Sequence, residues 1–203
     1  GDPIFAAAYG RASSFCGSAG VELCEPLSFK GRMGSGIAGA VRPEEIMTAT
    51  VITNAGFTQA AIGLANRAVT KLLIIQYLFI VDTTPSHPTP RIARALMAAA
   101  ERGVQVDILL NHFSHGRAAR DAARRRPPAL QHQNIDLRWH TSGSVLHCKI
   151  IVGDELEMLI GSHNLSHWSL TRSQNLSMLT VDTTTARDIL AIYRPLFDKG
   201  KRA

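Results

Sequence analysis

The sequence has no hydrophobic run long enough to cross a membrane as a helix. Its longest apolar stretch, LLIIQYLFIV, covers residues 72–81, whereas a helix needs about 20 apolar residues to span the hydrocarbon core. A short and continuously apolar segment of this kind is typical of a buried β-strand. We therefore expect no stable membrane insertion.

Cysteine is scarce as well, since Cys16, Cys24 and Cys148 are the only three. An odd and small number argues against a disulfide framework. Cys16 and Cys24 could pair in an oxidising compartment, but we favour free thiols. No CxxC pair suggests a zinc site, and no cluster of carboxylates suggests Mg²⁺. We therefore expect neither a bound metal nor a cofactor.

Acidic residues are outnumbered: 22 Lys and Arg stand against 16 Asp and Glu, which gives a formal net charge of +6. This balance favours anionic partners such as nucleic acid, an anionic membrane surface or phosphorylated substrates. Part of the excess lies in one run, which we expect on a solvated helix face that can also follow a nucleic-acid backbone. The run consists of Arg117, Arg120, Arg124, Arg125 and Arg126.

The 203 residues, 45% of them hydrophobic, suit one medium domain with an appendage. Residues 1–47 are rich in Gly, Ser and Ala, and we predict a partly irregular N-terminal appendage with a short helix at Phe5–Ala12. The stretch GSGIAG at 34–39 fits the dinucleotide-binding pattern G-x-G-x-x-G. It lacks a preceding strand, and Pro43 follows closely, so a flexible loop explains it better.

Residues 48–203 are predicted to form the main domain, because strand and helix patterns alternate there as in α/β folds. Proposed helix signals are an N-cap at Thr58, Pro90 in a first turn, a stop at Gly103, and a cap from Thr183 to Thr185. Strands are expected at 48–53, 71–80, 104–110, 135–140, 145–153 and 157–162, and helices at 57–69, 88–103, 115–126 and 183–200.

The segment VLHCKIIVGDELEMLIGSHNLS, residues 145–166, carries the densest chemistry. In a strand His147 and Lys149 point to one face, whereas Cys148 points into the core as an inert thiol. After a turn near Gly153, the chain returns and brings Ser162 and Asn164 beside this pair. The segment therefore predicts an imidazole, an ammonium, a hydroxyl and an amide around one small site.

Such a site suits a phosphoryl group. Lys149 would neutralise its oxygens, while Ser162 and Asn164 would donate hydrogen bonds to them. His147 would be the nucleophile, since imidazole attacks phosphorus well and also leaves well. Because no metal is needed for these steps, the chemistry can be metal-independent.

The spacing H-x-K-x4-D-x6-G-S-x-N resembles the HKD signature of the phospholipase D superfamily. Its members here are His147, Lys149, Asp154, Gly161, Ser162 and Asn164. The resemblance covers residues from about 48 to the C-terminus. It implies a layered α/β fold with a mixed central sheet flanked by helices on both faces, and a phosphohistidine intermediate. As a member of the motif, Asp154 is also a catalytic candidate, although in the family this aspartate tends to be structural.

The chain carries a single motif, whereas the family's reaction uses two histidines. Short relatives, the Nuc-type endonucleases and the Zucchini-like mitochondrial group, solve this by forming a homodimer. The resemblance therefore implies a homodimer with both motifs at the interface, in which the second histidine is His147 of another copy.

One position departs from the family pattern. A Glu-Asn pair usually follows the G-S-x-N segment, and its glutamate orients the catalytic imidazole; here Gln174 and Asn175 stand in those places. Gln174 can accept a hydrogen bond but supplies no negative charge. We expect a native arrangement with a modest loss of rate. A slow enzyme, a deliberate substitution and an alignment shifted by one residue remain alternatives.

Other residues are candidates for substrate binding. His163 and Trp168 flank the motif and are expected to line the cleft, together with His167, and a tryptophan there could stack a base. A rim or interface position explains Trp168 equally well. His112 and His115 make a weak metal site without a third ligand, so we expect a loop near the substrate groove.

These features favour a metal-independent endonuclease acting on DNA or RNA without sequence specificity. The alternatives are a phospholipase D or phosphatidyltransferase acting on lipids, and a catalytically weakened nucleic-acid-binding subunit. We expect a bacterial cytoplasmic protein. The periplasm or secretion stays open because the sequence begins with Gly1.

Overall fold

An eight-stranded mixed sheet organises the chain in the computed structural model, which describes residues 48–112 and 130–203. The strands run in the spatial order β1-β7-β6-β5-β2-β3-β4-β8. Their bounds are β1 Thr48–Thr53, β2 Lys71–Gln76, β3 Gln105–Asn111, β4 Ile135–His140, β5 Lys149–Gly153, β6 Glu157–Gly161, β7 Leu176–Val181 and β8 Lys201–Arg202.

The centre of the sheet is parallel and its flanks are antiparallel. β2, β3 and β4 pair in parallel, and β5 pairs antiparallel with β2. β6, β7 and β1 continue antiparallel on one side, and β8 closes the other side beside β4. The predicted mixed α/β sheet is therefore confirmed.

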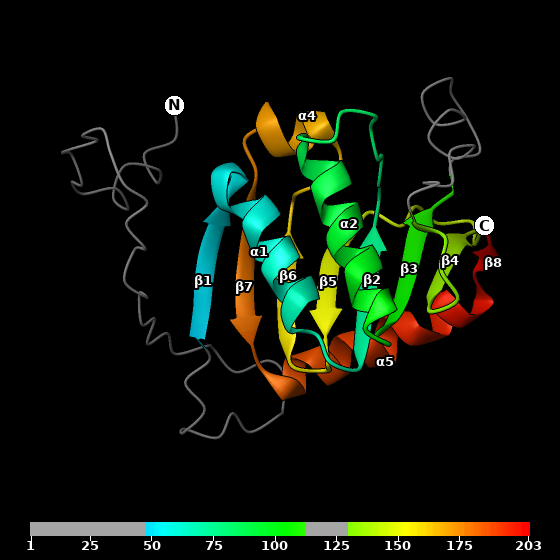
Figure 1. The fold of residues 1–203 in the computed structure, drawn as a ribbon. Helices are drawn as coiled ribbons and strands as arrows, with labels where there is room; N and C mark the ends of the chain where they lie inside the picture. The colour runs from blue at the N-terminus through cyan, green and yellow to red at the C-terminus, as the bar shows by residue number, and fades with distance from the viewer. Residues whose placement is uncertain (1–47, 113–129) are drawn as a thin grey trace, which may run out of the picture.

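Helices cover both faces of this sheet, as predicted. Figure 1 shows α1 and α2 on one face and α5 on the other, with the short α4 near the end of the sheet where β2 and β3 finish. Their bounds are α1 Asn54–Arg67, α2 Pro88–Glu101, α4 His167–Thr171 and α5 Thr183–Lys199.

Two cores follow from this sandwich, and β2 contributes to both. Leu72 and Ile74 pack in the core that includes α1 and α2, whereas Leu73 and Ile75 pack in the core that includes Phe197 of α5. A strand covered on both faces has no solvent side, which explains the continuous apolar run read from the sequence.

Some predicted helix signals are wrong. Thr58 is buried inside α1, which begins at Asn54 after its N-cap Thr53. The cap of α5 is Asp182, whose carboxylate accepts hydrogen bonds from the backbone amides of Thr184 and Thr185. A carboxylate can accept several amide hydrogen bonds at once, so it replaces the predicted threonine cap.

Two elements near the motif, α4 and β7, are not among the predicted ones. The predicted appendage with its short helix, Cys16, Cys24, His115 and the basic run at 117–126 lie outside the described residues, so these stay predictions. Within the described ranges, no helix combines the length and the apolar character needed to cross a bilayer.

Candidate active site

The motif histidine lies where β2 and β3 end and β5 begins. Two hydrogen bonds fix the backbone on either side of it. The amide of Leu146 donates to Oδ1 of Asn111 at 2.8 Å, and the amide of Tyr77 donates to the carbonyl of Cys148 at 3.0 Å. Asn111 is not among the predicted site residues, although its position at the end of a buried strand is a usable signal.

Side chains point to alternating sides along this segment, as predicted, although the predicted strand 145–153 begins only at Lys149, so His147 precedes it. Leu146 and Ile150 belong to the core beneath α5, with Cys148 packed against it, and Ile151 belongs to the opposite core. The Cys148 thiol is 2.7 Å from the hydroxyl of Tyr193. Burial and this contact raise the pKa of Tyr193 to about 12. Cys148 therefore occupies a packing position.

His147 and Lys149 form a compact group with Tyr77. His147 is exposed, and its ring meets the Tyr77 ring edge-on with centroids 4.8 Å apart. Lys149 is only 7% exposed; its Nζ donates to the carbonyl of His147 at 2.7 Å and lies 5.1 Å from the Tyr77 ring centroid. Burial lowers the pKa of Lys149. A buried ammonium thus binds the backbone carbonyl of the residue that carries the accessible imidazole, and both side chains contact Tyr77.

The second half of the motif begins at Gly161, at the end of β6. A side chain there would place its Cβ 2.2 Å from Oγ of Ser177 and 2.4 Å from the carbonyl of Leu176. Only glycine fits such a close approach of β6 and β7. The hydroxyl of Ser162 donates to Oδ1 of Asn175 at 2.9 Å and accepts from the amide of Leu176 at 3.1 Å. Ser162 therefore ties the motif to β7.

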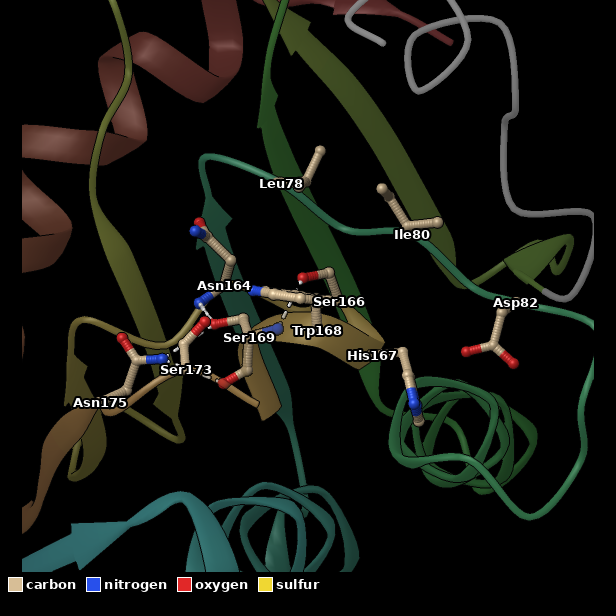
Figure 2. A pocket seen from close by; sticks show the side chains of 10 residues that line it. All are labelled: Leu78, Ile80, Asp82, Asn164, Ser166, His167, Trp168, Ser169, Ser173 and Asn175. Carbon is tan, nitrogen blue, oxygen red and sulfur yellow. Dashed lines mark hydrogen bonds between the residues drawn. The ribbon is translucent and has the colours of Figure 1, made fainter. Parts of the chain in front are cut away.

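Asn164 is half-buried and faces a groove with a volume of 580 Å³. Its backbone amide donates to Oγ of Ser169, while its side-chain Oδ1 is buried without a hydrogen-bond partner among the described residues. The groove is lined by Leu78, Ile80, Asp82, Asn164, Ser166, His167, Trp168, Ser169, Ser173 and Asn175. Figure 2 shows Asn164 toward one end of it, with Asp82 and His167 at the other.

The chain after β2 connects the two halves of the motif. Its first residue, Tyr77, contacts His147, and its next part pairs with the segment that follows Asn164. The amide of Leu165 donates to the carbonyl of Leu78 at 3.0 Å, and the amide of Ile80 donates to the carbonyl of Leu165 at 2.8 Å. Residues 77–80 therefore contact both halves of the motif. They were predicted as the end of a strand over 71–80, but β2 ends at Gln76.

The position of Asp154 does not support a catalytic role. Its carboxylate accepts hydrogen bonds from the amides of Val69, Thr70 and Lys71 at 2.8–2.9 Å. It lies beyond the far end of β5, about 20 Å along an extended chain from His147. Burial opposes its ionisation, but the hydrogen bonds from Lys71 and its neighbours prevail and lower its pKa. Asp154 fastens a turn, as the family resemblance suggested.

The cleft-lining role of His163 is wrong. The residue is 0% exposed and its ring stacks on Phe57 with centroids 4.3 Å apart. Its Nδ1 is 2.7 Å from Oγ of Ser177 and its Nε2 is 2.8 Å from Oδ1 of Asn54. Burial lowers its pKa to about 4. His163 lies between Ser162 and Asn164 but points the other way, into the core.

The remaining candidates lie near the surface. Trp168 is 64% exposed and lines the groove, with the Arg172 guanidinium 5.5 Å from its ring centroid. Gln174 is exposed just before Asn175. His112 is exposed at the end of β3, where its backbone amide donates to the carbonyl of His140. His112 thus shares the end of the sheet with the motif histidine.

Comparison with protein families gives one match over most of the described chain. Residues 61–197 match the family described as "Cardiolipin synthase, PLD-like domain". A curated but uncharacterised protein of Streptococcus mutans serotype c (strain ATCC 700610 / UA159) is 27% identical over 141 residues. This alignment covers 70% of the present chain and 29% of that protein, so the chain spans less than a third of its relative.

Solved structures share the fold. Nuc from Salmonella typhimurium, titled a phospholipase D family member, superposes with a TM-score of 0.63 and 21% identity, covering 77% of this chain and 98% of that one. NucT from Helicobacter pylori gives a TM-score of 0.59 and 16% identity, covering 77% and 99% of the two chains. At these identities the likeness concerns the fold.

Proposed function

Because the chain belongs to the phospholipase D-like family, we propose that it is a metal-independent phosphodiesterase and, more narrowly, an endonuclease on DNA or RNA without sequence specificity. The observation that carries this proposal is the exposed imidazole of His147 together with the buried ammonium of Lys149, which binds the backbone carbonyl of His147. The net charge of +6 supports an anionic polymer as substrate.

In the first step a ring nitrogen of His147 attacks the phosphodiester. A P–N bond forms, the P–O bond to the leaving strand breaks, and the leaving oxygen takes a proton from a second imidazole. In the second step a water molecule gives a proton to that imidazole and attacks phosphorus, which breaks the P–N bond and releases His147. Lys149 donates one of its three N–H groups to the His147 carbonyl, so two remain for phosphate oxygens.

The second imidazole comes from another copy of the chain. One motif supplies one nucleophile, and a two-fold axis places two identical motifs face to face. The exposure of His147 at the end of the sheet is what such an arrangement requires. A homodimer is therefore part of the proposal.

Gln174 is proposed to orient the imidazole through its amide oxygen, without the charge that a glutamate would add. The substitution Gln174→Glu should raise kcat, by up to about tenfold, because a carboxylate stabilises the imidazolium of the acid–base histidine. Single-turnover cleavage at several pH values measures this. An unchanged rate would exclude Gln174 as an orienting residue.

A lipid phosphodiesterase is the second candidate, and the description of the matching family favours it. The apolar Leu78, Ile80 and Trp168 in the groove could also contact an acyl chain. A nucleic-acid-binding subunit without catalysis is the third candidate. Substrate comparison separates all of these.

The test is cleavage of plasmid and single-stranded oligonucleotides in excess EDTA, beside hydrolysis of phosphatidylcholine and phosphatidylglycerol vesicles. We expect nucleic-acid cleavage that persists in EDTA and disappears in His147→Ala. The control is His132→Gln, whose histidine accepts a hydrogen bond from the amide of Asn134 away from the motif. Turnover of lipid alone would establish the second candidate. Tight nucleic-acid binding without cleavage would establish the third.

A further inference from the structure

Three side chains that can bind a metal converge at the end of the groove opposite Asn164. Asp82 and His87 come from the loop between β2 and α2, and His167 is the first residue of α4. One ligand atom from each lies within 4.8 Å of the others. Figure 2 shows Asp82 and His167 on the same side of the groove. The sequence offered no hint of this, since 80 residues separate the two histidines.

Two imidazole nitrogens of this cluster lack hydrogen-bond partners within the described part of the chain. Nδ1 of His87 lies 2.9 Å from Oδ1 of Asp82, yet the two are not aligned as a hydrogen bond. Among the described residues, Nδ1 of His87 and Nδ1 of His167 are buried without a hydrogen-bond partner. Buried imidazole nitrogens usually find a partner. Close, unaligned donor atoms are instead typical of ligands that share one cation.

Neighbouring groups hold the three side chains in place. Asp82 accepts hydrogen bonds from the amide of Thr84 at 3.0 Å and from the hydroxyl of Thr89 at 3.2 Å. His87 is the N-cap residue of α2, without a side-chain capping hydrogen bond, and its amide donates to the carbonyl of Thr84 at 3.0 Å. Such supporting contacts orient ligands in metal sites. The cluster is therefore built on a helix start and a braced loop.

The two imidazole rings now stack with centroids 3.9 Å apart and an angle of 22° between their planes. In a tetrahedral site with metal–nitrogen bonds near 2.0–2.1 Å, the centroids would lie about 5 Å apart. Binding therefore requires His87 and His167 to tilt away from each other. Both rings are half-buried, so neither is enclosed on all sides, and His167 also lines the groove.

We propose that Asp82, His87 and His167 bind one divalent transition-metal ion, with Zn²⁺ favoured, and leave one coordination position open to the groove. Two imidazoles and a carboxylate are a donor set that Zn²⁺ accepts with an open fourth position. Mg²⁺ and Ca²⁺ prefer oxygen ligands throughout. A phosphate oxygen of a bound substrate can fill the open position. The ion adds substrate affinity and takes no part in the attack by His147.

Metal binding itself is independent of the proposed function, whereas its use for a substrate phosphate rests on that function. The first measurement titrates the EDTA-treated full chain with Co²⁺ by visible absorption, and with Zn²⁺ by calorimetry. We expect one ion per chain, with Zn²⁺ displacing Co²⁺. Inorganic phosphate should change the Co²⁺ spectrum by filling the fourth coordination position. An unchanged spectrum would refute the proposal that this position is open.

The variants Asp82→Asn, His87→Gln and His167→Gln should each weaken Zn²⁺ binding by at least tenfold, while His147→Gln and His132→Gln should bind it normally. Circular dichroism checks that each variant is folded. Zn²⁺ at 100 times its Kd should raise the ratio of folded to unfolded unmodified chain about 100-fold, and the three ligand variants should lose this shift. Unchanged affinity in all three, or no binding by the unmodified chain, would overturn the site.

The two proposals can fail separately. Zn²⁺ binding without cleavage would leave the metal site standing and refute the nuclease. If the chain has no affinity for Zn²⁺ but cleaves nucleic acid in a reaction that depends on His147, the nuclease proposal stands and the metal site is refuted. If both hold, EDTA should raise the KM for an oligonucleotide several-fold and leave kcat unchanged. A fall in kcat would overturn the accessory role of the ion.

Discussion

At the scale of single residues, environment separates side chains that the sequence places next to one another. His163 is fully buried between two hydrogen-bond partners and a phenyl ring, whereas Asn164 turns its amide into a groove. Asp154 belongs to the recognised signature but serves a turn remote from the imidazole. A motif therefore specifies positions in the chain, and packing assigns their roles.

The burial of His163 predicts a pH dependence of stability. The unfolded chain protonates this imidazole near pH 6.5, whereas the folded chain does so only near pH 4. Stability contributed by the neutral form is thus complete above pH 6.5 and is lost as the pH falls toward 4, by roughly 1–3 kcal/mol. Urea unfolding between pH 4 and 7 measures this. His163→Gln should flatten that slope, and a slope equal to the unmodified one would assign it to another group.

Asp154→Ala tests the structural role of that residue. Loss of its hydrogen bonds to the backbone of residues 69–71 should cost roughly 2–3 kcal/mol of unfolding free energy. The kcat of the folded fraction should change less than twofold. Urea unfolding measures the change in unfolding free energy, and kinetics normalised to the concentration of active sites measure kcat. A large fall in kcat with normal stability would restore a catalytic role.

At the scale of elements, the β6–β7 pair positions the second half of the motif. Ser162 bonds to Asn175 and Leu176, and His163 bonds to Ser177, so β7 holds the motif from the side. Sequence patterns did not predict β7. The apolar Leu176 is exposed whereas the polar Ser177 is buried, so the hydrophobic pattern of the sequence does not mark the buried face of this strand.

Gly161→Ala tests this pairing. The added Cβ meets backbone and side-chain atoms of β7 at 2.2–2.4 Å, so the strands must separate, at a cost of about 1–3 kcal/mol or more. Because Ser162 moves with them, kcat/KM should fall at least tenfold. The matched control is Gly143→Ala, since no described atom lies within 4 Å of a Cβ there. Equal behaviour of the two variants in thermal unfolding and kinetics would contradict the argument.

At the scale of the whole molecule, a single motif per chain makes assembly part of the proposed chemistry. If each cleavage event needs His147 from two copies, a dimer of one unmodified and one His147→Ala chain must be inactive. After unfolding and refolding an equal mixture of unmodified and His147→Ala chains, about a quarter of the dimers keep both histidines. Activity should then fall to about one quarter.

Analytical ultracentrifugation of the mixture and of each parent provides the matching assembly measurement. Independent subunits would instead retain one half of the activity, and a monomer at working concentration would refute the shared site.

The sequence by itself determined the order of chemical groups along the chain and most local structure. Alternation predicted that Cys148 points into the core, and Gly103, at φ 97°, follows the end of a helix as predicted. Such features depend on periods of two or 3.6 residues and on single φ values. Fold and motif recognition rest on the same local information.

Only the tertiary structure decided which distant side chains meet. Tyr77 reaches His147 because β2 pairs with β5, and Asp82 reaches His167 because the chain after β2 runs beside the segment after Asn164. No local period encodes these encounters, since they depend on strand order across the sheet. Long-range strand pairing thus brings distant side chains to the motif at residues 145–166.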